Sequence, residues 1–253
     1  MMGGEIKADG IYFGDAYELI KHIPDGSVDL ILTDPPYDFG GTSFGGLTKK
    51  MKYTGEFKDF ITGYDYSLLT EMRRVMKKVN IYLWCNKAQI KTYLEFFHGC
   101  NFEVIIWGKS NPPPFTNGHY LKDKEYCLYF WEKGVKVHPT YETGKTVYLS
   151  KTNVKDKKSY GHPTIKPLQI IKNLELNSSE RGGTILDPMM GSGTTCVAAK
   201  ELGRKYIGFE IDRGYFEIAK RRIEETQEGG SNVPGKEKKI HNERPSPRPH
   251  RRG

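Results

Sequence analysis

The stretch TILDPMMGSGTT, residues 184–195, decides the fold of this 253-residue chain. A short apolar strand ends at Asp187, and the small residues that follow Gly193 are typical of a packed helix. Between them, Gly191 and Gly193 allow backbone N–H groups to approach a ligand closely, next to the positive end of the helix dipole. The turn lacks the lysine of a P-loop, which argues against triphosphate binding. Taken alone, such a turn can also be a tight strand–helix connection without a ligand.

A second strand, in RKYIGFEID at residues 204–212, follows the glycines and ends at Glu210. An acid placed about 20 residues after a glycine turn, at the end of the next strand, can accept both hydroxyls of a ribose. In IYFGDAYELI, residues 11–20, Asp15 follows a strand in the same way. Asp15 can accept from an adenine amino group or cap the following helix, since Asp is a good N-cap. Both roles stay open.

A third strand, in VDLILTDPPY at residues 28–37, runs directly into Asp34, Pro35, Pro36 and Tyr37. Prolines cannot donate to the hydrogen-bond ladder of a sheet, so the chain leaves the sheet at Asp34. Ligands of open α/β sheets bind beyond the carboxyl ends of strands. We therefore expect Asp34 and Glu210 to face one crevice. Alone, the same residues would also suit a rigid turn.

Apolar strands and periodic helices alternate along the chain, which predicts a parallel, doubly wound α/β sheet. We expect a Rossmann-like, seven-stranded, mostly parallel sheet. Its strands are predicted at residues 11–13, 28–33, 79–85, 102–107, 126–131, 184–187 and 206–210. Helices are predicted at residues 16–23, 66–77, 87–97, 166–177, 194–202 and 213–226.

Three polar segments do not follow the alternation. Residues 38–63 suit a long loop, and residues 133–161 suit a small insert within a domain that spans residues 10–226. Residues 227–253 contain seven Lys or Arg and three Glu and are too polar to fold alone. They carry half of the net charge of +8, an excess that favours polyanionic partners such as nucleic acid.

The remaining composition points to an intracellular protein. The four cysteines are widely spaced, which predicts reduced thiols and no metal site. No apolar run approaches the ~20 residues that a membrane span needs, and the N-terminus has no apolar signal core. We expect a soluble, cytoplasmic protein that does not associate with membranes.

Together these residues resemble the S-adenosylmethionine-dependent DNA amino-methyltransferases over about residues 10–222. The early DPPY and the late glycine turn match the order of the β group, in which target-recognition residues lie between the two. The resemblance implies a class I methyltransferase fold, S-adenosyl-L-methionine as cofactor and double-stranded DNA as substrate. It implies that Asp34, Pro35, Pro36 and Tyr37 form the catalytic tetrad. It allows a homodimer and a cognate restriction endonuclease as partners, as in restriction-modification systems.

The resemblance also assigns further residues. The segment from Trp107 to Pro112 resembles the family's segment near the flipped base, and HPTIKP at residues 162–167 resembles its cofactor-side element. The expected cofactor contacts are Asp15, Asp34, His162, Thr164, Lys166, Asp187, Pro188, Met189, Gly191, Ser192, Gly193, Thr194, Thr195, Glu210 and Asp212. The expected DNA contacts are Trp107, Lys109 and Asn111, with the loop lysines Lys49, Lys50, Lys52, Lys151, Lys155, Lys157 and Lys158. The chain departs from the family's usual residues at Asp38, Ser110 and Met189.

This resemblance predicts methyl transfer to an exocyclic amino group of a flipped base. Asp34 and the Pro35 carbonyl would accept its two N–H bonds, and Tyr37 would stack on the base. In the family an acidic first tetrad residue accompanies adenine more often than cytosine, so we expect N6 of adenine, with N4 of cytosine as the alternative. An RNA or protein methyltransferase is less consistent with the motif order. A DNA-binding protein without catalysis is less consistent with the intact tetrad.

Overall fold

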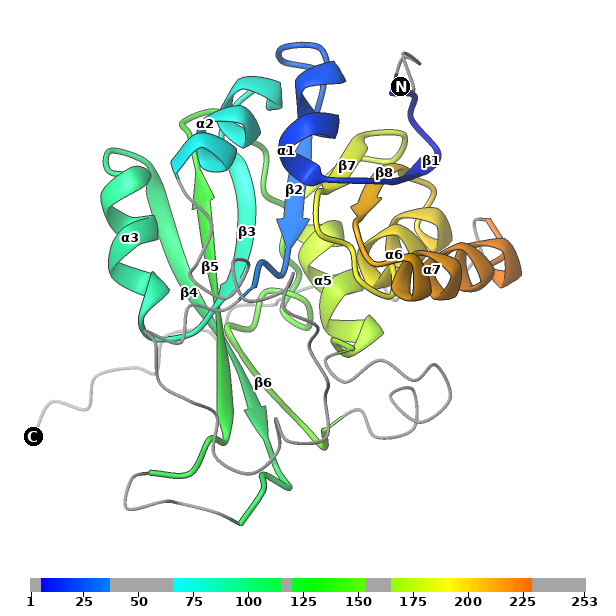
Figure 1. Ribbon diagram of the computed structural model, residues 1–253. Helices are drawn as coiled ribbons and strands as arrows, with labels where there is room; N and C mark the ends of the chain where they lie inside the picture. The colour runs from blue at the N-terminus through cyan, green and yellow to red at the C-terminus, as the bar shows by residue number, and fades with distance from the viewer. Residues whose placement is uncertain (1–5, 37–65, 115–119, 153–164, 229–253) are drawn as a thin grey trace, which may run out of the picture.

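The computed structural model describes residues 6–36, 66–114, 120–152 and 165–228, and these residues form an eight-stranded sheet between two layers of helices (Figure 1). The strands are β1 (Gly10–Phe13), β2 (Leu30–Thr33), β3 (Asn80–Cys85), β4 (Asn101–Lys109), β5 (Lys124–Trp131), β6 (Val147–Ser150), β7 (Thr184–Asp187) and β8 (Lys205–Glu210). The helices are α1 (Ala16–Leu19), the 3-10 helix η1 (Ile20–His22), α2 (Tyr66–Val75), α3 (Gln89–Phe96), α5 (Leu168–Ser178), α6 (Thr194–Glu201) and α7 (Arg213–Glu225).

The sheet has the strand order β1-β8-β7-β2-β3-β5-β4-β6, and β5 alone among these strands runs antiparallel to its neighbours. This confirms the predicted mostly parallel α/β fold, with one strand more than the seven expected. The additional strand is β6, which pairs in parallel with β4 and lies within the segment 133–161 that was predicted to be a polar insert. Its sequence is VYLS, a short apolar run whose residues alternate between exposed and half-buried, and it was included in the polar insert because the surrounding segment is polar.

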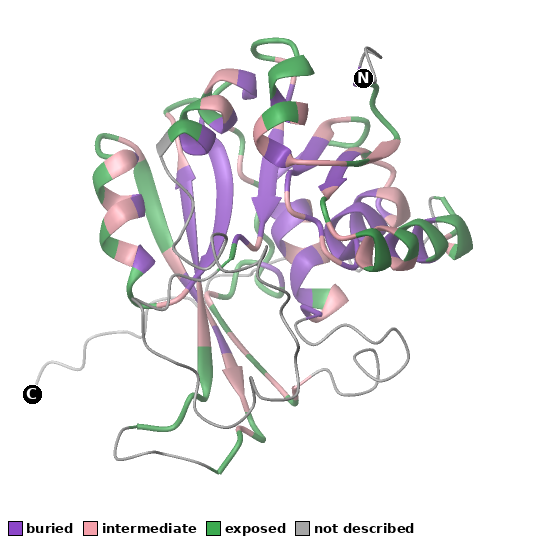
Figure 2. Ribbon diagram, in the orientation of Figure 1, coloured by how far each residue is buried: buried purple, intermediate pink, exposed green. Residues whose placement is uncertain are grey.

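The sheet buries apolar residues on both faces, as Figure 2 shows for the central strands. Strand β2 illustrates the division. Ile31 packs in the cluster formed with η1, α2 and α3, whereas Leu30 and Leu32 pack in the cluster formed with α5 and α6. Both faces of the central strands are therefore covered, as the near-continuous apolar sequence predicted. No helix in the described part of the chain is both long enough and apolar enough to cross a membrane.

The position of the functional site follows from the connections of β2 and β7. These two strands pair in parallel, with Leu30 opposite Ile185 and Ile31 opposite Leu186. From β7 the chain passes through α6 to β8 on one side, whereas from β2 it passes through α2 to β3 on the other side. Open α/β sheets bind ligands where neighbouring connections diverge in this way, outside the carboxyl ends of the strands. We call this place, between the ends of β2 and β7, the switch point.

Candidate active site

The turn between β7 and α6 is held open by two glycines in the left-handed region. Gly191 has a φ of 51° and Gly193, the N-cap of α6, has a φ of 75°. A Cβ atom added to Gly193 would lie 2.9 Å from the Cβ of Ala219 in α7. Glycine at residue 193 therefore permits both the backbone conformation and the close packing of α7 against the turn.

Arg222 of α7 forms hydrogen bonds with the same turn. Its guanidinium group is buried and donates to the carbonyl oxygen of Ser192, to Ser192 Oγ at 3.0 Å and to Thr194 Oγ1 at 3.1 Å. The hydroxyl groups of Ser192 and Thr194 thus accept hydrogen bonds from α7, and the cofactor contacts predicted for these two residues stay predictions. Arg222 was not predicted from the sequence, although an arginine between the buried Ala219 and Ile223 was a usable signal.

Glu210 joins the glycine turn to the end of β8. One carboxylate oxygen accepts from the N–H of Gly191 at 2.9 Å and the other from the N–H of Asp212 at 2.7 Å. Burial raises the pKa of Glu210 above its usual value, and these hydrogen bonds oppose that rise. Asp212 caps α7 by accepting from the N–H of Tyr215 at 2.9 Å. The predicted ribose acid and the glycine turn therefore lie in direct contact.

Asp15 serves as the N-cap of α1, where its side chain accepts from the N–H of Tyr17 at 2.9 Å. The sequence left open whether Asp15 caps a helix or binds adenine, and the structure shows the helix cap. The preceding strand ends beside the ribose acid, because Phe13 pairs with Glu210. This placement keeps Asp15 at the same edge of the sheet as Glu210, so a contact with a cofactor base stays a prediction.

Asp187 ends β7 on the inner side of the turn, with 4% of the residue exposed. Burial raises the pKa of its carboxyl group to about 7. Hydrogen bonds from neighbouring hydroxyl groups and from the N–H of Met189 lower that pKa, whereas the negative charge of Asp34 raises it. Asp34 is close enough to act on Asp187 because their strands, β2 and β7, are neighbours. The switch point thus brings the predicted catalytic acid and the glycine turn together.

The backbone after Asp34 is fixed from α3. Gln89 Nε2 donates to the carbonyl oxygen of Pro36 at 3.0 Å and contacts the hydroxyl of Tyr93 at 3.2 Å. The amide of Gln89 is itself oriented by the N–H of Asn86, which donates to Gln89 Oε1 at 3.1 Å. Gln89 is buried and lies more than 50 residues from Asp34 in sequence, so no local pattern indicated this contact.

A chain of alternating charges surrounds the side chain of Asp34. The Lys166 ammonium forms ion pairs with Asp34 Oδ2 and, at 3.1 Å, with Glu125 Oε2. Lys109 Nζ pairs with the other oxygen of Glu125 at 2.6 Å. Lys166 was predicted to bind the cofactor, and the structure places it on the predicted catalytic acid. Glu125 was not predicted at all, although it is the acidic start of an otherwise apolar strand.

Two residues predicted to bind DNA are engaged inside the protein. Trp107 is 1% exposed, and its Nε1 donates to Ser150 Oγ at 2.8 Å. Lys109 is half-buried in its ion pair and lies 5.3 Å from the centre of the Trp107 ring. The Trp107 indole is therefore buried and the Lys109 ammonium is paired with Glu125, and the DNA contacts of these two residues stay predictions.

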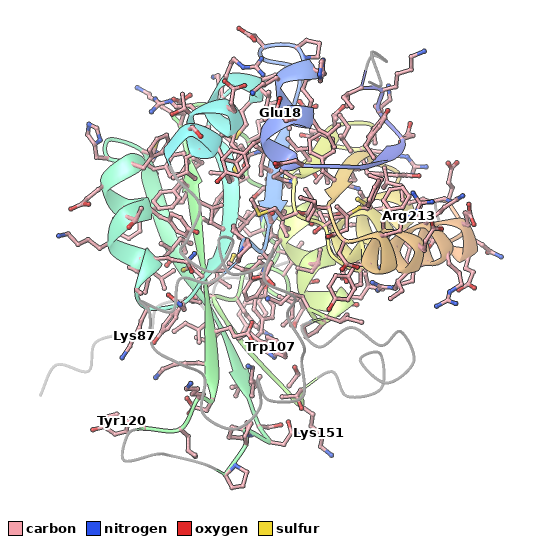
Figure 3. The ribbon with its side chains drawn as sticks, in the orientation of Figure 1. Glu18, Lys87, Trp107, Tyr120, Lys151 and Arg213 are labelled. Atoms are coloured by element: carbon pink, nitrogen blue, oxygen red, sulfur yellow. The ribbon has the colours of Figure 1, made fainter. Side chains whose placement is uncertain are left out.

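Asn111 and Lys151 are exposed where β4 and β6 end, at the same edge of the sheet as the switch point. Figure 3 shows Lys151, Lys87 and Tyr120 around this end of the molecule, with Glu18 far above them. Their DNA contacts stay predictions. Other predicted residues lie outside the described parts of the chain: Tyr37, Lys49, Lys50, Lys52, Lys155, Lys157, Lys158, His162 and Thr164, together with the loop 38–63 and the tail from residue 229.

Residues 28–221 match the N6/N4 methyltransferase family, described as DNA methylase. Among curated proteins, the type II methyltransferase M2.MboI of Moraxella bovis is 30% identical over 241 residues, which cover 85% of this chain and 87% of that protein. The type II methyltransferase M.HinfI of Haemophilus influenzae is 29% identical over 253 aligned residues, which cover 87% of this chain and 69% of that protein.

Solved structures show the same relationship. M1.HpyAVI in complex with SAM is 27% identical and superposes with a TM-score of 0.65, covering 84% of this chain and 98% of that chain. The cytosine-N4-specific PvuII DNA methyltransferase has a TM-score of 0.65 at 17% identity, with 87% of each chain covered, and so shares the fold. With Asp34, the glycine turn and Glu210 gathered at the carboxyl edge of the sheet, the chain belongs to the N6/N4 DNA methylases, which use S-adenosylmethionine to methylate an amino group of DNA.

Proposed function

We propose that this DNA methyltransferase acts on the exocyclic N6 of adenine in double-stranded DNA. The observation that carries the proposal is the pairing of β2 with β7, which sets Asp34 beside the glycine turn, where we propose that the methyl donor binds. The identity of the base rests on Asp34 itself, because an acidic first tetrad residue accompanies adenine more often in this family. N4 of cytosine is the second candidate, and a neighbour with the same fold, PvuII methyltransferase, is named for that specificity.

The chain's own residues suit this chemistry. An exocyclic amino group is a poor nucleophile because its lone pair is delocalised into the base ring. Asp34 and the carbonyl of Pro35 would accept its two N–H bonds and stabilise the positive charge that develops on nitrogen. The second proline is already tied to Gln89, and Pro35 is buried. Little ordering of this turn then remains at the moment of reaction.

The residues on the other side of the switch point fit S-adenosylmethionine. When bound, the cofactor supplies an electrophilic methyl group and brings positive charge on its sulfonium and ammonium groups. Burial raises the pKa values of the acids Asp187 and Glu210, and a cation beside them would favour their charged forms. The N-terminus of α6 suits the carboxylate of the methionine moiety.

The target base must leave the duplex to reach Asp34, at a cost of a few kcal/mol. We propose that Tyr37 stacks on the flipped base, an interaction worth roughly 1–3 kcal/mol. With Trp107 buried, the opposite wall of the base site must come from other residues. We expect the enzyme to act in the cytoplasm, where bacterial DNA is found. A homodimer and a cognate endonuclease remain predictions of the family resemblance.

The test is transfer of tritium from labelled S-adenosylmethionine to unmethylated bacterial DNA, followed by nucleoside analysis. We expect N6-methyladenine with the wild type and a loss of at least about 100-fold for Asp34→Asn, the range expected when a group that acts in the transition state is removed. Cofactor affinity, measured by calorimetry, should stay within a few-fold. Asp29→Asn is the matched control, because Asp29 pairs with Lys77 at the opposite end of the same strand.

Each alternative product has a distinct meaning. Formation of N4-methylcytosine would keep the mechanism and overturn the assignment of adenine. Cofactor binding without a DNA product, in a folded protein, would move the proposal to RNA or protein substrates. Full activity of Asp34→Asn would remove Asp34 from the mechanism.

A further inference from the structure

We infer that Lys166 and Glu125 are positioning residues for Asp34: Glu125 fixes the Lys166 ammonium, and the ammonium holds the carboxylate of Asp34 ready to accept the target amino group. This inference rests on the proposed function, in which Asp34 is the catalytic acid. It gives Lys166 a role different from the cofactor contact that the family resemblance implied, and it adds Glu125 to the site.

The three side chains come from three separate elements. Asp34 follows β2, Glu125 lies in β5, and Lys166 precedes α5. The Lys166 side chain is 6% exposed and bridges the two carboxylates. Its ammonium also lies 5.1 Å from the centre of the Trp84 ring, which closes one side of it. A lysine buried at this depth is tolerated because both partners are acids, so the arrangement is stable only as a unit.

The expected charges of Lys166 and Glu125 support the inference that the Lys166 ammonium is held in place. Burial alone would lower the pKa of Lys166, but Asp34 and Glu125 outweigh it and raise that pKa. Burial alone would raise the pKa of Glu125, but Lys166 and Lys109 outweigh it and lower that pKa to about 2. Cys85 of β3 and Cys127 of β5 also face the group, and burial raises the pKa of both thiols, that of Cys85 to about 12. Glu125 and Lys166 therefore stay charged, and Cys85 neutral, throughout the working range of the enzyme.

The remaining charged neighbour explains why Asp34 needs a cation. Asp187 lies across the switch point, and its charge and that of Asp34 each oppose the other. Without Lys166, ionised Asp187 would favour a protonated Asp34, which has lower acceptor capacity for the amino group. The Lys166 ammonium favours the carboxylate form and contacts Oδ2, and a carboxylate keeps further acceptor positions for the substrate.

The test measures kcat against pH, between pH 4 and 9, for Lys166→Met, Lys166→Arg and Glu125→Gln. We expect Lys166→Met to lower kcat at pH 7 by about tenfold or more. The acidic limb of the pH profile, where kcat falls at low pH, should move about one pH unit upward. Glu125→Gln should shift the limb in the same direction by less, because Lys166 would keep one partner. Lys166→Arg should restore the wild-type limb. The KM for S-adenosylmethionine should change by less than about threefold.

Lys172→Met is the matched control, since Lys172 of α5 forms a 2.8 Å ion pair with Glu201 away from the switch point. It should leave the limb where it is. If Lys166→Met scales kcat equally at all pH values, or raises only the KM for the cofactor, the inference is wrong. If Lys166→Met does not fold, an unshifted limb in Glu125→Gln overturns it. Failure of the proposed function is separate, because the wild type would then make no methylated base.

Discussion

The buried carboxyl group of Asp187 makes the switch point sensitive to pH. With a pKa of about 7, it is protonated in mildly acidic solution and ionised above neutrality. A carboxyl group whose pKa is raised on folding contributes stability below its unfolded pKa, and that contribution disappears as pH rises through the folded value. The ligand-free protein therefore loses stability from this residue between about pH 4 and pH 7.

We expect the unfolding free energies of wild type and Asp187→Asn to diverge as pH rises. The mutant lacks this contribution, so the wild type should lose about 2–4 kcal/mol relative to it between pH 4.5 and 8. Urea denaturation at several pH values measures the difference. The cofactor, which brings positive charge, should stabilise the wild type more at pH 8 than at pH 6. Parallel stability curves for the two proteins would contradict the assignment.

At the scale of single residues, the sequence predicted the acids of the site better than the residues that contact them. Asp34, Asp187 and Glu210 were predicted because each ends an apolar strand, and the end of a strand can be identified locally. Gln89 and Glu125 were missed because their contacts depend on how distant elements pack. The DNA contact of Trp107 was predicted from the resemblance of residues 107–112 to the family's segment near the flipped base, a resemblance that does not report how far the ring is buried.

At the scale of elements, the contact between the glycine turn and α7 sets the shape of the cofactor side. Gly193 has a left-handed φ and lies against Ala219, while Arg222 binds the next hydroxyl groups. Any movement of α7 would therefore change the turn, and any side chain at residue 193 would move α7. The two helices α6 and α7 act as one support for the methyl donor.

Gly193→Ala should destabilise the protein by about 2–4 kcal/mol, because it adds overpacking to the cost of a left-handed backbone. Gly26→Ala is the matched control, with a φ of 59° and nothing within 4 Å of the added Cβ. It should cost only about 1–2 kcal/mol, the backbone part alone. Thermal unfolding gives both values, and calorimetry should show weaker cofactor binding for Gly193→Ala only. Equal destabilisation in the two variants would remove the role of the Ala219 contact.

Strands were predicted correctly where both faces of the sheet are buried, whereas the edge strand β6 was missed. The central strands have apolar residues on both faces, and their near-continuous apolar runs located them. Strand β6 has Val147 and Leu149 exposed and hydrogen bonds only to β4 among the described strands. The apolar run of β6 is only three residues long and lies in a polar segment, so the sequence did not distinguish it from the insert and its pairing with β4 reveals it.

For the whole molecule, charge at the end that bears the switch point should govern DNA affinity. Lys87 and Lys151 are exposed there, after β3 and β6 (Figure 3). Replacing both by alanine should reduce the slope of log affinity against log salt by about 0.9 for each phosphate that is no longer neutralised. Fluorescence anisotropy with a labelled duplex measures the slope. Lys205→Ala, at the opposite end of β8, should leave it unchanged, and an equal change there would indicate nonspecific charge effects.

The pairing of β2 with β7 also constrains how the protein is made. The N–H of Thr184 donates to the carboxylate of Asp29, 155 residues away in sequence, where these strands begin. During synthesis β2 leaves the ribosome early, whereas its partner follows only after most of the chain has been translated. Contacts between such distant segments form slowly, and unpaired apolar strands are prone to aggregate. The order of motifs that places the predicted catalytic acid first therefore leaves the centre of the sheet incomplete until β7, 155 residues after Asp29, has been translated, a period in which chaperones would protect it.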